Sequence, residues 1–273
     1  MINYFFIMNK KFKILLIILS VIIILQLDVL VIEPNFIVTN EIDLKNTGNE
    51  MKIIFLSDFQ RRDNDPAFVQ RVVDIVNEQN PDLILLGGDY IEKSLSELPS
   101  VEPLRKMESS FGTFAVMGNH DYDVYWYAPG TANPETANQI EKFLTANNTI
   151  QFLSNQNVEF ENINVIGLDS YWPGLRDDTK AKRSSEDFTI VLTHNQDDLE
   201  INKENADLYL FGHTHCGQVR LPGIGSVPKA MGFRGVFDHQ YYLVDGVHIY
   251  TTCGLTTAPR FLNPPEIAII NLT

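Results

Sequence analysis

The residues best suited to do chemistry are two histidines, His213 and His215, which lie two positions apart just after the apolar run 206–211. That run is typical of a buried strand, and the glycines around the histidines allow a tight turn. On an extended turn, His213 and His215 can face a shared site from different sides, so each could bind one metal ion of a pair. Taken alone, a His-x-His pair is more often an ordinary part of a polar loop.

Four more apolar runs end in side chains that can ligate metal. The side chains are Asp58 with Gln60 after 52–56, Asp89 after 81–86, Asn119 with His120 after 113–117, and His194 after 188–192. A single Asp or Asn after a strand usually makes a turn or caps a helix. Five strand ends that all carry such side chains indicate a shared metal site.

The predicted elements explain how these strand ends meet. Strands and helical segments alternate through the first half of the domain, at 52–56, 66–79, 81–86, 95–109 and 113–117. This alternation predicts a parallel sheet with right-handed crossovers, and such sheets bind ligands at the carboxyl ends of their strands. The second half has more strands, separated by Gly and Pro turns, which predicts a second and more antiparallel sheet. We therefore expect an α/β fold.

The composition is that of an ordinary folded protein, with 44% hydrophobic and 21% charged residues among 273. The 35 acidic against 21 basic residues argue against a nucleic-acid partner, because phosphate binding favours a basic face. Two cysteines, Cys216 and Cys253, exclude a disulfide framework or a cysteine zinc cluster. A quiet buried Cys216 is favoured over a metal contact, and pairing with Cys253 stays open.

The N-terminal segment differs from the rest of the chain. Three lysines precede the apolar run 14–25, which continues with two polar interruptions to Ile32 and so reaches the roughly 20 residues that a bilayer needs. No small-x-small cleavage site follows, so residues 1–33 are predicted as an uncleaved transmembrane anchor rather than a removed signal peptide or a buried helix. The lysines favour a domain outside the cytoplasm, although a domain on the cytoplasmic face would look similar. We expect a connector at 34–50, with a first edge strand, and one domain at 51–273.

The strand ends together resemble the ordered blocks of the calcineurin-like metallophosphoesterase superfamily, which are D-x-H, G-D, G-N-H-D/E, a later His and G-H-x-H. The resemblance extends from about Met51 to the C-terminus. It is strongest to a membrane-anchored bacterial branch, through the segments 87–90, 118–122, 212–222 and 264–267. The resemblance implies a four-layer α/β/β/α sandwich and an anchor in the bacterial inner membrane.

The resemblance also implies two divalent metal ions bridged by Asp89. One ion is assigned to Asp58, Gln60, Asp89 and His215, and the other to Asp89, Asn119, His194 and His213. Two such ions about 3.5–4 Å apart clamp a phosphate and activate a shared water as the hydroxide nucleophile. His120 would stabilise the transition state or protonate the leaving oxygen, and Asp121 would orient its ring. Structural roles for His120 and Asp121 are the alternatives.

Gln60 departs from the family, which usually has His at this position. An amide oxygen is a harder ligand than imidazole and favours Mn²⁺ or Mg²⁺, with Zn²⁺ or iron as further candidates. The alternative is that Gln60 does not ligate.

Substrate contacts are predicted from arginines and aromatic residues near the motifs. Guanidinium matches phosphate geometry, so the candidates are Arg62, Arg220, Arg234 and Arg260, with structural salt bridges as the alternative. Five aromatic residues follow the metal motifs, and three roles are open for them: a lid over the substrate, contact with the bilayer interface, or packing in the core. They are Tyr122, Tyr125, Trp126, Tyr127 and Trp172.

The activity implied by the resemblance is hydrolysis of a phosphodiester or diphosphate bond. An anchored enzyme favours a lipid-linked substrate, such as UDP-2,3-diacylglucosamine in lipid A biosynthesis. The alternatives are a broad phosphodiesterase or phosphatase that acts on nucleotides or wall polymers and, less favoured, an inactive module that binds a phosphorylated ligand. The oligomeric state is not predicted.

Overall fold

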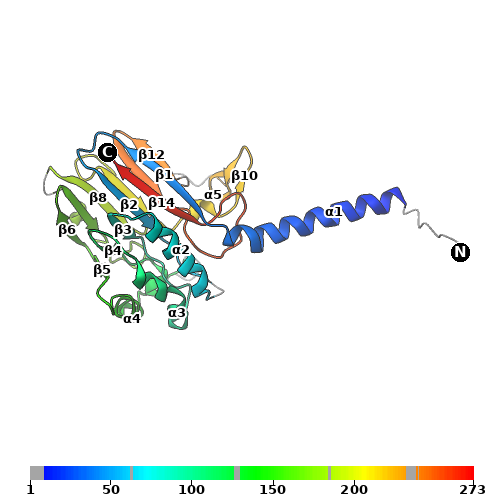
Figure 1. Cartoon of the computed structure of the whole chain (residues 1–273), viewed down its shortest axis with the longest axis horizontal. Coiled ribbons are helices and arrows are strands. Elements are labelled where there is room, and N and C mark those ends of the chain that lie inside the picture. Colours follow the sequence, from blue (N-terminus) through cyan, green and yellow to red (C-terminus); the bar gives the residue numbers. More distant parts are fainter. Residues whose placement is uncertain (1–8, 62–63, 126–129, 184–185, 232–237, 239) are drawn as a thin grey trace.

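The computed structural model describes residues 9–61, 64–125, 130–183, 186–231, 238 and 240–273 (Figure 1). Within this part of the chain, two six-stranded sheets pack face to face, and a long N-terminal helix projects away from them. The α/β sandwich expected from the sequence is therefore confirmed. Arg62, Arg234, Trp126 and Tyr127, which the sequence analysis names as candidates for substrate contact, lie outside the described residues.

The first sheet has the strand order β1-β14-β2-β3-β4-β5. Its strands are β1 (Val38–Leu44), β2 (Met51–Leu56), β3 (Leu83–Leu86), β4 (Thr113–Ala115), β5 (Ile150–Phe152) and β14 (Glu266–Leu272). Strands β2 to β5 pair in parallel, as the alternation of strands and helices predicts. Strand β14 is antiparallel to β2 and parallel to β1, so part of the segment expected as a connector forms the sheet edge.

The second sheet has the order β12-β13-β9-β8-β7-β6. Its strands are β6 (Gln156–Phe160), β7 (Ile163–Gly167), β8 (Phe188–Thr193), β9 (Leu208–Phe211), β12 (Tyr241–Val244) and β13 (Val247–Thr251). Its four central strands are parallel and its two edge pairings are antiparallel, whereas the first sheet has one antiparallel pairing. The second sheet is thus more antiparallel than the first, as predicted, although its centre is parallel. Some of the Gly and Pro turns belong to a separate small hairpin, β10 (Arg220–Leu221) and β11 (Gly225–Ser226).

Helices cover the outer face of the first sheet. Helix α2 (Pro66–Glu78) starts at Asp65, whose carboxylate accepts hydrogen bonds from two backbone amides of the first turn, and it buries five apolar residues. The helix expected over 95–109 is broken into 3₁₀ turns around α3 (Leu98–Val101), because prolines interrupt its hydrogen bonding. Helix α4 (Pro134–Leu144) completes this layer.

The core lies in three apolar layers, of which the middle one fills the space between the sheets. The outer face of the second sheet is covered differently from what the four-layer expectation implies. In the described parts of the connections from β7 to β8 and from β8 to β9, irregular chain with one 3₁₀ turn (Asp178–Lys180) packs Leu168, Ala181 and Leu199 on that face. The fourth layer is therefore mostly loop.

Helix α1 (Lys10–Leu27) has no buried residue and continues through a π-helical turn (Asp28–Ile32) and a 3₁₀ turn (Glu33–Asn35). It is long and apolar enough to cross a membrane. Its domain-proximal end is fixed to the sandwich. The carboxylate of Glu33 accepts hydrogen bonds from the backbone amides of Leu262 and Asn263, and Arg61 donates to the Pro34 carbonyl and to Asn35 Oδ1.

Two leucine substitutions test whether the middle apolar layer stabilises the fold. Leu85 is fully buried in β3, and truncation to alanine is expected to cost about 2–5 kcal/mol of unfolding free energy. Leu243 is exposed, and its truncation is expected to change the unfolding free energy by at most about 0.5 kcal/mol. Urea unfolding of the full chain in detergent, followed by circular dichroism, measures both. Equal midpoints for Leu85→Ala and Leu243→Ala would contradict this description of the core.

Candidate metal centre

All seven side chains expected to ligate metal gather at one edge of the sandwich. They follow the carboxyl ends of β2, β3, β4, β8 and β9, which parallel pairing brings to the same edge. A cleft of about 390 Å³ opens there. Five of the ligand candidates line it: Gln60, Asp89, Asn119, His213 and His215. The rest of the lining comes from His120, Glu92, Trp172 and the loops that follow His213 and Leu255.

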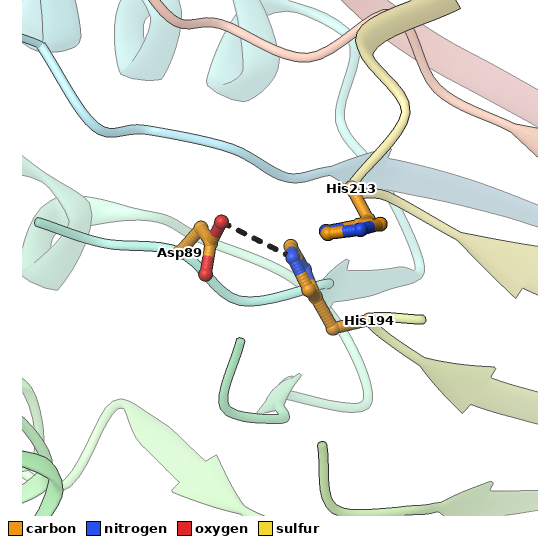
Figure 2. Close-up of side chains that lie close together, drawn as sticks. All are labelled: Asp89, His194 and His213. Atoms are coloured by element: carbon orange, nitrogen blue, oxygen red, sulfur yellow. Dashed lines mark ion pairs between the residues drawn. The ribbon is translucent and has the colours of Figure 1, made fainter. Parts of the chain in front are cut away.

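Three of these side chains form a group whose ligand atoms lie within 4.8 Å of one another: Asp89, His194 and His213 (Figure 2). His194 Nε2 lies 3.1 Å from Asp89 Oδ2. The orientation of its ring is set from behind, because Nδ1 lies 2.7 Å from the carbonyl oxygen of Gly87. The ring of His213 lies beside that of His194, with 5.2 Å between centroids.

A second group shares Asp89 and lies next to the first. His215 Nε2 is 3.0 Å from Asp58 Oδ1, and Gln60 Nε2 donates a hydrogen bond of 3.0 Å to Asp89 Oδ2. Asp58 Oδ1 also lies 3.9 Å from His194 Nε2, so the two groups form one continuous cluster. This arrangement is compatible with the two ligand sets that the family resemblance implies.

Several buried atoms of the cluster lack the partners that burial normally requires. Asp58 Oδ2 and Gln60 Oε1 are inaccessible to water and form no hydrogen bond, and His194 Nε2 has only its ion-pair contact of 3.1 Å with Asp89 Oδ2. Such an atom costs about 1–3 kcal/mol unless another interaction compensates for it. A divalent cation would satisfy all three, and carboxylate, amide and imidazole donors together suit Mn²⁺, Mg²⁺ or Zn²⁺. The residues therefore fit a metal pair.

The pKa shifts describe how the cluster balances its charge. Burial alone would raise the pKa of Asp58 and of Asp89, yet neighbouring histidines hold both below the usual value. Burial alone would lower the pKa of His194, but Asp89 and Asp58 raise it to about 9. Burial and the charge of His194 lower the pKa of His213 to about 3. The imidazolium of His194 thus supplies positive charge next to the place where a cation would bind.

The backbone at the ligands is held in an uncommon conformation. Asp58, Asp89, His213 and His215 have φ angles of 59°, 57°, 66° and 49°, in the left-handed region that residues other than glycine rarely adopt. Such strain persists only where the surroundings stabilise it, and it is frequent at functional sites. The backbone at Gly118 also lies very close to Asp89, because a Cβ atom on Gly118 would lie 2.0 Å from Asp89 Oδ1. A larger residue at position 118 would therefore displace this ligand.

Asp121 fixes this backbone. Its carboxylate accepts hydrogen bonds of 2.8 Å from the backbone amides of Asp89, Tyr90 and Gly118. Burial, with the charge of Asp89 as the next cause, raises the pKa of Asp121 to about 7. Because both oxygens bind backbone amides, Asp121 does not orient the ring of His120, and that sequence-based expectation is wrong.

His120 is oriented by a different group. Its Nδ1 lies 2.8 Å from the carbonyl oxygen of Glu92, and its ring edge packs on Tyr125 with 4.8 Å between centroids. Its backbone amide donates to Asp89 Oδ1. Since Nδ1 is engaged by the carbonyl, Nε2 is the ring nitrogen left for the cleft that His120 lines.

Asn119 is held in a conformation suited to metal binding. Its Nδ2 donates to the Val124 carbonyl over 2.7 Å, while its Oδ1 accepts only a long bond of 3.4 Å from Asn195 Nδ2. Sequence analysis missed Asn195, which is fully buried and is fixed by Ser170 Oγ. The available signal was its position directly after His194 at a strand end.

Of the four arginines predicted to contact substrate, the two that the structure describes, Arg220 and Arg260, do not line the cleft. Arg260 is fully buried and donates to the carbonyl oxygens of Cys253, Gly254, Thr256 and Asn263. Arg220 donates to the carbonyl oxygens of Cys216 and Asp238 and lines a separate cavity of about 310 Å³. Arg260 is therefore a buried structural residue, and the expectation that it contacts substrate is wrong. Arg220 lies outside the cleft beside the ligand candidates, which we call the metal cleft. No Lys or Arg is among the described residues that line the metal cleft.

The aromatic candidates divide between the cleft and the core. Trp172 packs its ring edge against His213, with 4.4 Å between centroids, and forms part of the cleft wall. Tyr122 is buried, and its hydroxyl donates to Asp169. Tyr122 therefore packs in the interior, whereas Trp172 lines the cleft beside His213.

The turn that carries the paired histidines is braced from three sides. Cys216 is buried, as expected, and forms with Cys253 the disulfide that the sequence left open. Gln218 Nε2 lies 2.7 Å from His215 Nδ1, and Asn263 Nδ2 donates to the His215 carbonyl. Sequence analysis missed Gln218 and Asn263, because nothing local marks either side chain as a partner of His215.

Comparisons with known proteins agree with this geometry. The sequence profile of the calcineurin-like phosphoesterase family matches residues 51–217. An uncharacterized metallophosphoesterase of Helicobacter pylori is 32% identical over 84% of this chain, and the chain covers 61% of that relative's length. Phosphodiesterase YaeI of Escherichia coli is 31% identical over 84% of both chains. UDP-2,3-diacylglucosamine pyrophosphatase LpxG of Chlamydia muridarum is 24% identical over 88% of this chain and 90% of LpxG. With five strand ends and their ligand side chains at one edge, this chain belongs to the calcineurin-like phosphoesterase family.

Proposed function

We propose that the protein is a membrane-anchored, two-metal phosphoesterase that hydrolyses a phosphodiester or diphosphate bond. The observation that carries this proposal is the convergence of the buried, unpartnered oxygens of Asp58 and Gln60 with the His194–Asp89 pair, beside a cleft whose described lining has no Lys or Arg. A phosphate in this cleft would have its charge neutralised by bound cations, since the described cleft side chains supply no permanent positive charge.

The ligand assignment follows from the two groups in the cluster. Asp58, Gln60, Asp89 and His215 would hold one ion, and Asp89, Asn119, His194 and His213 the other. When bound, the two ions would neutralise the phosphate and lower the pKa of a water between them. Manganese is the ion we favour, because three carboxylate or amide oxygens beside one imidazole make a hard donor set around the first site.

His120 is the side chain we assign to the leaving group. Nδ1 donates its proton to the Glu92 carbonyl, so Nε2 would donate to a leaving oxygen from the imidazolium form of the ring, which would then become neutral imidazole. Trp172 would exclude water from one side of the cleft and keep His213 in place. Asp121 would act as a positioning residue for Asp89 rather than as a catalytic one.

For the substrate we propose a phosphodiester or diphosphate on an amphiphile, with UDP-2,3-diacylglucosamine as the first molecule to test. The support is the apolar helix α1 together with the similarity to LpxG. A broad phosphodiesterase outside the cytoplasm is the second candidate, and it is supported by a specific observation. The Cys216–Cys253 disulfide is typical of an oxidising compartment, and the lysines before α1 favour the same side.

Hydrolysis by the full chain in detergent tests the proposed function. After chelation, Mn²⁺, Mg²⁺ or Zn²⁺ is added back with bis-p-nitrophenyl phosphate or UDP-2,3-diacylglucosamine. We expect a metal-dependent rate that Asp89→Asn lowers by at least about a hundredfold, because the bridging ligand is lost. The matched control is Asp74→Asn, an exposed carboxylate on α2, which should keep the wild-type rate.

The outcomes separate the candidates. Preferential cleavage of the lipid nucleotide supports the lipid-linked substrate, whereas cleavage of the diester alone supports the broad phosphodiesterase. Absence of hydrolysis with every metal would refute the enzyme proposal and favour a module that binds a phosphorylated ligand.

Gln60 provides a test of metal preference. Gln60→His replaces an amide oxygen by an imidazole and is expected to raise affinity for Zn²⁺ relative to Mn²⁺ by about tenfold. Competition with a chromophoric chelator measures both affinities on the full chain. Gln139→His, on the exposed face of α4, is the control and should leave the ratio unchanged. An unchanged ratio in Gln60→His would mean that residue 60 does not ligate.

The state of the two cysteines in cells tests the proposed side of the membrane. For a domain outside the cytoplasm, we expect both thiols to resist a polymer-linked maleimide until a reductant is added, since the described chain has no free cysteine. The labelled protein is read from its shift on a denaturing gel. Full labelling without reductant would place the domain in the cytoplasm.

A further inference from the structure

A group of exposed apolar side chains lies outside helix α1, close to its domain-proximal end. Leu221 and Ile224 belong to the β10–β11 hairpin and are 38% and 58% exposed, and Leu262 in the neighbouring loop is 55% exposed. We call these three residues the loop surface. Exposed leucine and isoleucine are ordinary when scattered, but a group of them beside an apolar helix calls for a partner.

Backbone hydrogen bonds connect the loop surface directly to α1. The amide of Arg220 donates to the Phe261 carbonyl over 2.9 Å, and the amide of Arg260 donates to the Val29 carbonyl over 3.1 Å. The Leu262 amide donates to the Glu33 carboxylate. Hairpin, loop and helix base are thus successive neighbours, and Figure 1 shows β10 and α5 (Val227–Ala230) beside the end of α1 where it joins the domain.

The conformation of Leu262 supports a role for its side chain. Its φ angle of 53° lies in the left-handed region, which is rarely adopted by a bulky aliphatic residue. In water, this residue would combine backbone strain with an exposed apolar side chain. Contact with lipid would compensate for the exposure, because it removes apolar surface from water.

The charge around the hairpin also favours a lipid partner. No Asp or Glu occurs from residue 208 to residue 237, although the chain has 35 acidic residues and a net charge of −14. Within that stretch, Arg220 and Lys229 flank the hairpin turn in the sequence. An apolar surface with basic residues beside it suits the headgroups of anionic lipids.

The opposite edge of the sandwich provides a contrast. The β12–β13 hairpin exposes Leu243 to 59%, but its turn contains Asp245. Because β13 runs parallel to β9, this turn lies at the amino ends of the strands, away from the metal cluster. Leu243 therefore matches Ile224 in exposure and in its place on a hairpin, and differs in distance from α1.

We propose that the loop surface is a second membrane contact, which rests on the anionic headgroups of the bilayer that α1 enters. The loop surface and the metal cleft share a loop, since Thr256 and Ala258 line the cleft and Leu262 follows them. The contact would hold the mouth of the cleft at the lipid surface. The consequence for substrate rests on the proposed function: the phosphate to be cleaved belongs to an amphiphile that stays in the bilayer.

Lipid-dependent quenching on the full chain tests the contact. Ile224→Cys and Leu243→Cys are each labelled with an environment-sensitive fluorophore, without reductant, so that the native disulfide stays intact. Both proteins are reconstituted into vesicles of phosphatidylcholine and phosphatidylglycerol that contain a lipid with a nitroxide near its headgroup. We expect quenching of at least about half the emission at residue 224, which would lie within the headgroup region, and almost none at residue 243.

Each other outcome overturns the proposal. Absence of quenching at residue 224, or equal quenching at both residues, would show that the loop surface is not selectively in contact with lipid. A blue shift at residue 224 without nitroxide quenching would assign the surface to a second copy of the chain or to another protein.

Hydrolysis separates failure of the contact from failure of the proposed function. Ile224→Asp is expected to slow cleavage of a phosphodiester lipid embedded in vesicles by about tenfold, through loss of apolar burial and repulsion from anionic lipid. The same variant should cleave water-soluble bis-p-nitrophenyl phosphate at the wild-type rate, as should Leu243→Asp. Equal cleavage of the embedded lipid by Ile224→Asp and Leu243→Asp would contradict the consequence for substrate. If the wild-type chain cleaves neither compound, the proposed function fails and the quenching result still decides the contact.

Discussion

Two buried carboxylates, Asp58 and Asp89, impose the constraint on which the rest of this structure depends. Each is removed from water, and each raises the electrostatic cost of ionising the other. No described Lys or Arg lines the adjacent cleft, and Arg260 acts on Asp58 only from the interior, so positive charge inside the cleft comes from the histidines or from bound cations. The imidazolium of His194 fills this role only in part, because Asp58 Oδ2 and Gln60 Oε1 remain without partners. The cluster is therefore most readily understood as a site built for cations.

The strained backbone of the ligands explains much of the surrounding architecture. Asp58, Asp89, His213 and His215 all have positive φ angles, so each needs external support. Asp121 supports the Asp89 turn through three backbone amides. The turn with both histidines is held by the disulfide and by side chains on either side of it. The buried hydrogen bonds and the disulfide around these turns thus hold the ligand atoms in place.

The features that the sequence predicts correctly are those with local signals. Apolar runs followed by Asp, Asn or His mark the strand ends, and alternation with helices predicts that Asp58, Asp89 and Asn119 share an edge. The roles of Asp121 and Arg260 depend on which distant backbone groups surround them, which no local pattern encodes. The disulfide depends on β9 and β13 being parallel neighbours. The cover of the second sheet was mispredicted because irregular chain has no periodicity to detect.

The segment from Cys253 to Asn263 connects the candidate metal centre to the base of helix α1. Its first residue forms the disulfide with the histidine turn. Its last residue, Asn263, donates from its side chain to the His215 carbonyl and from its backbone amide to the Glu33 carboxylate. Arg260 gathers four carbonyls of the same segment, and burial lowers the pKa of Arg260 only to about 10, so it remains a cation. Glu33 belongs to the helical continuation of α1, and so does the Val29 carbonyl that accepts from the Arg260 amide. The base of α1 and the turn with His213 and His215 are therefore held by the same segment, so the base of α1 is packed as part of the domain rather than attached by a flexible tether.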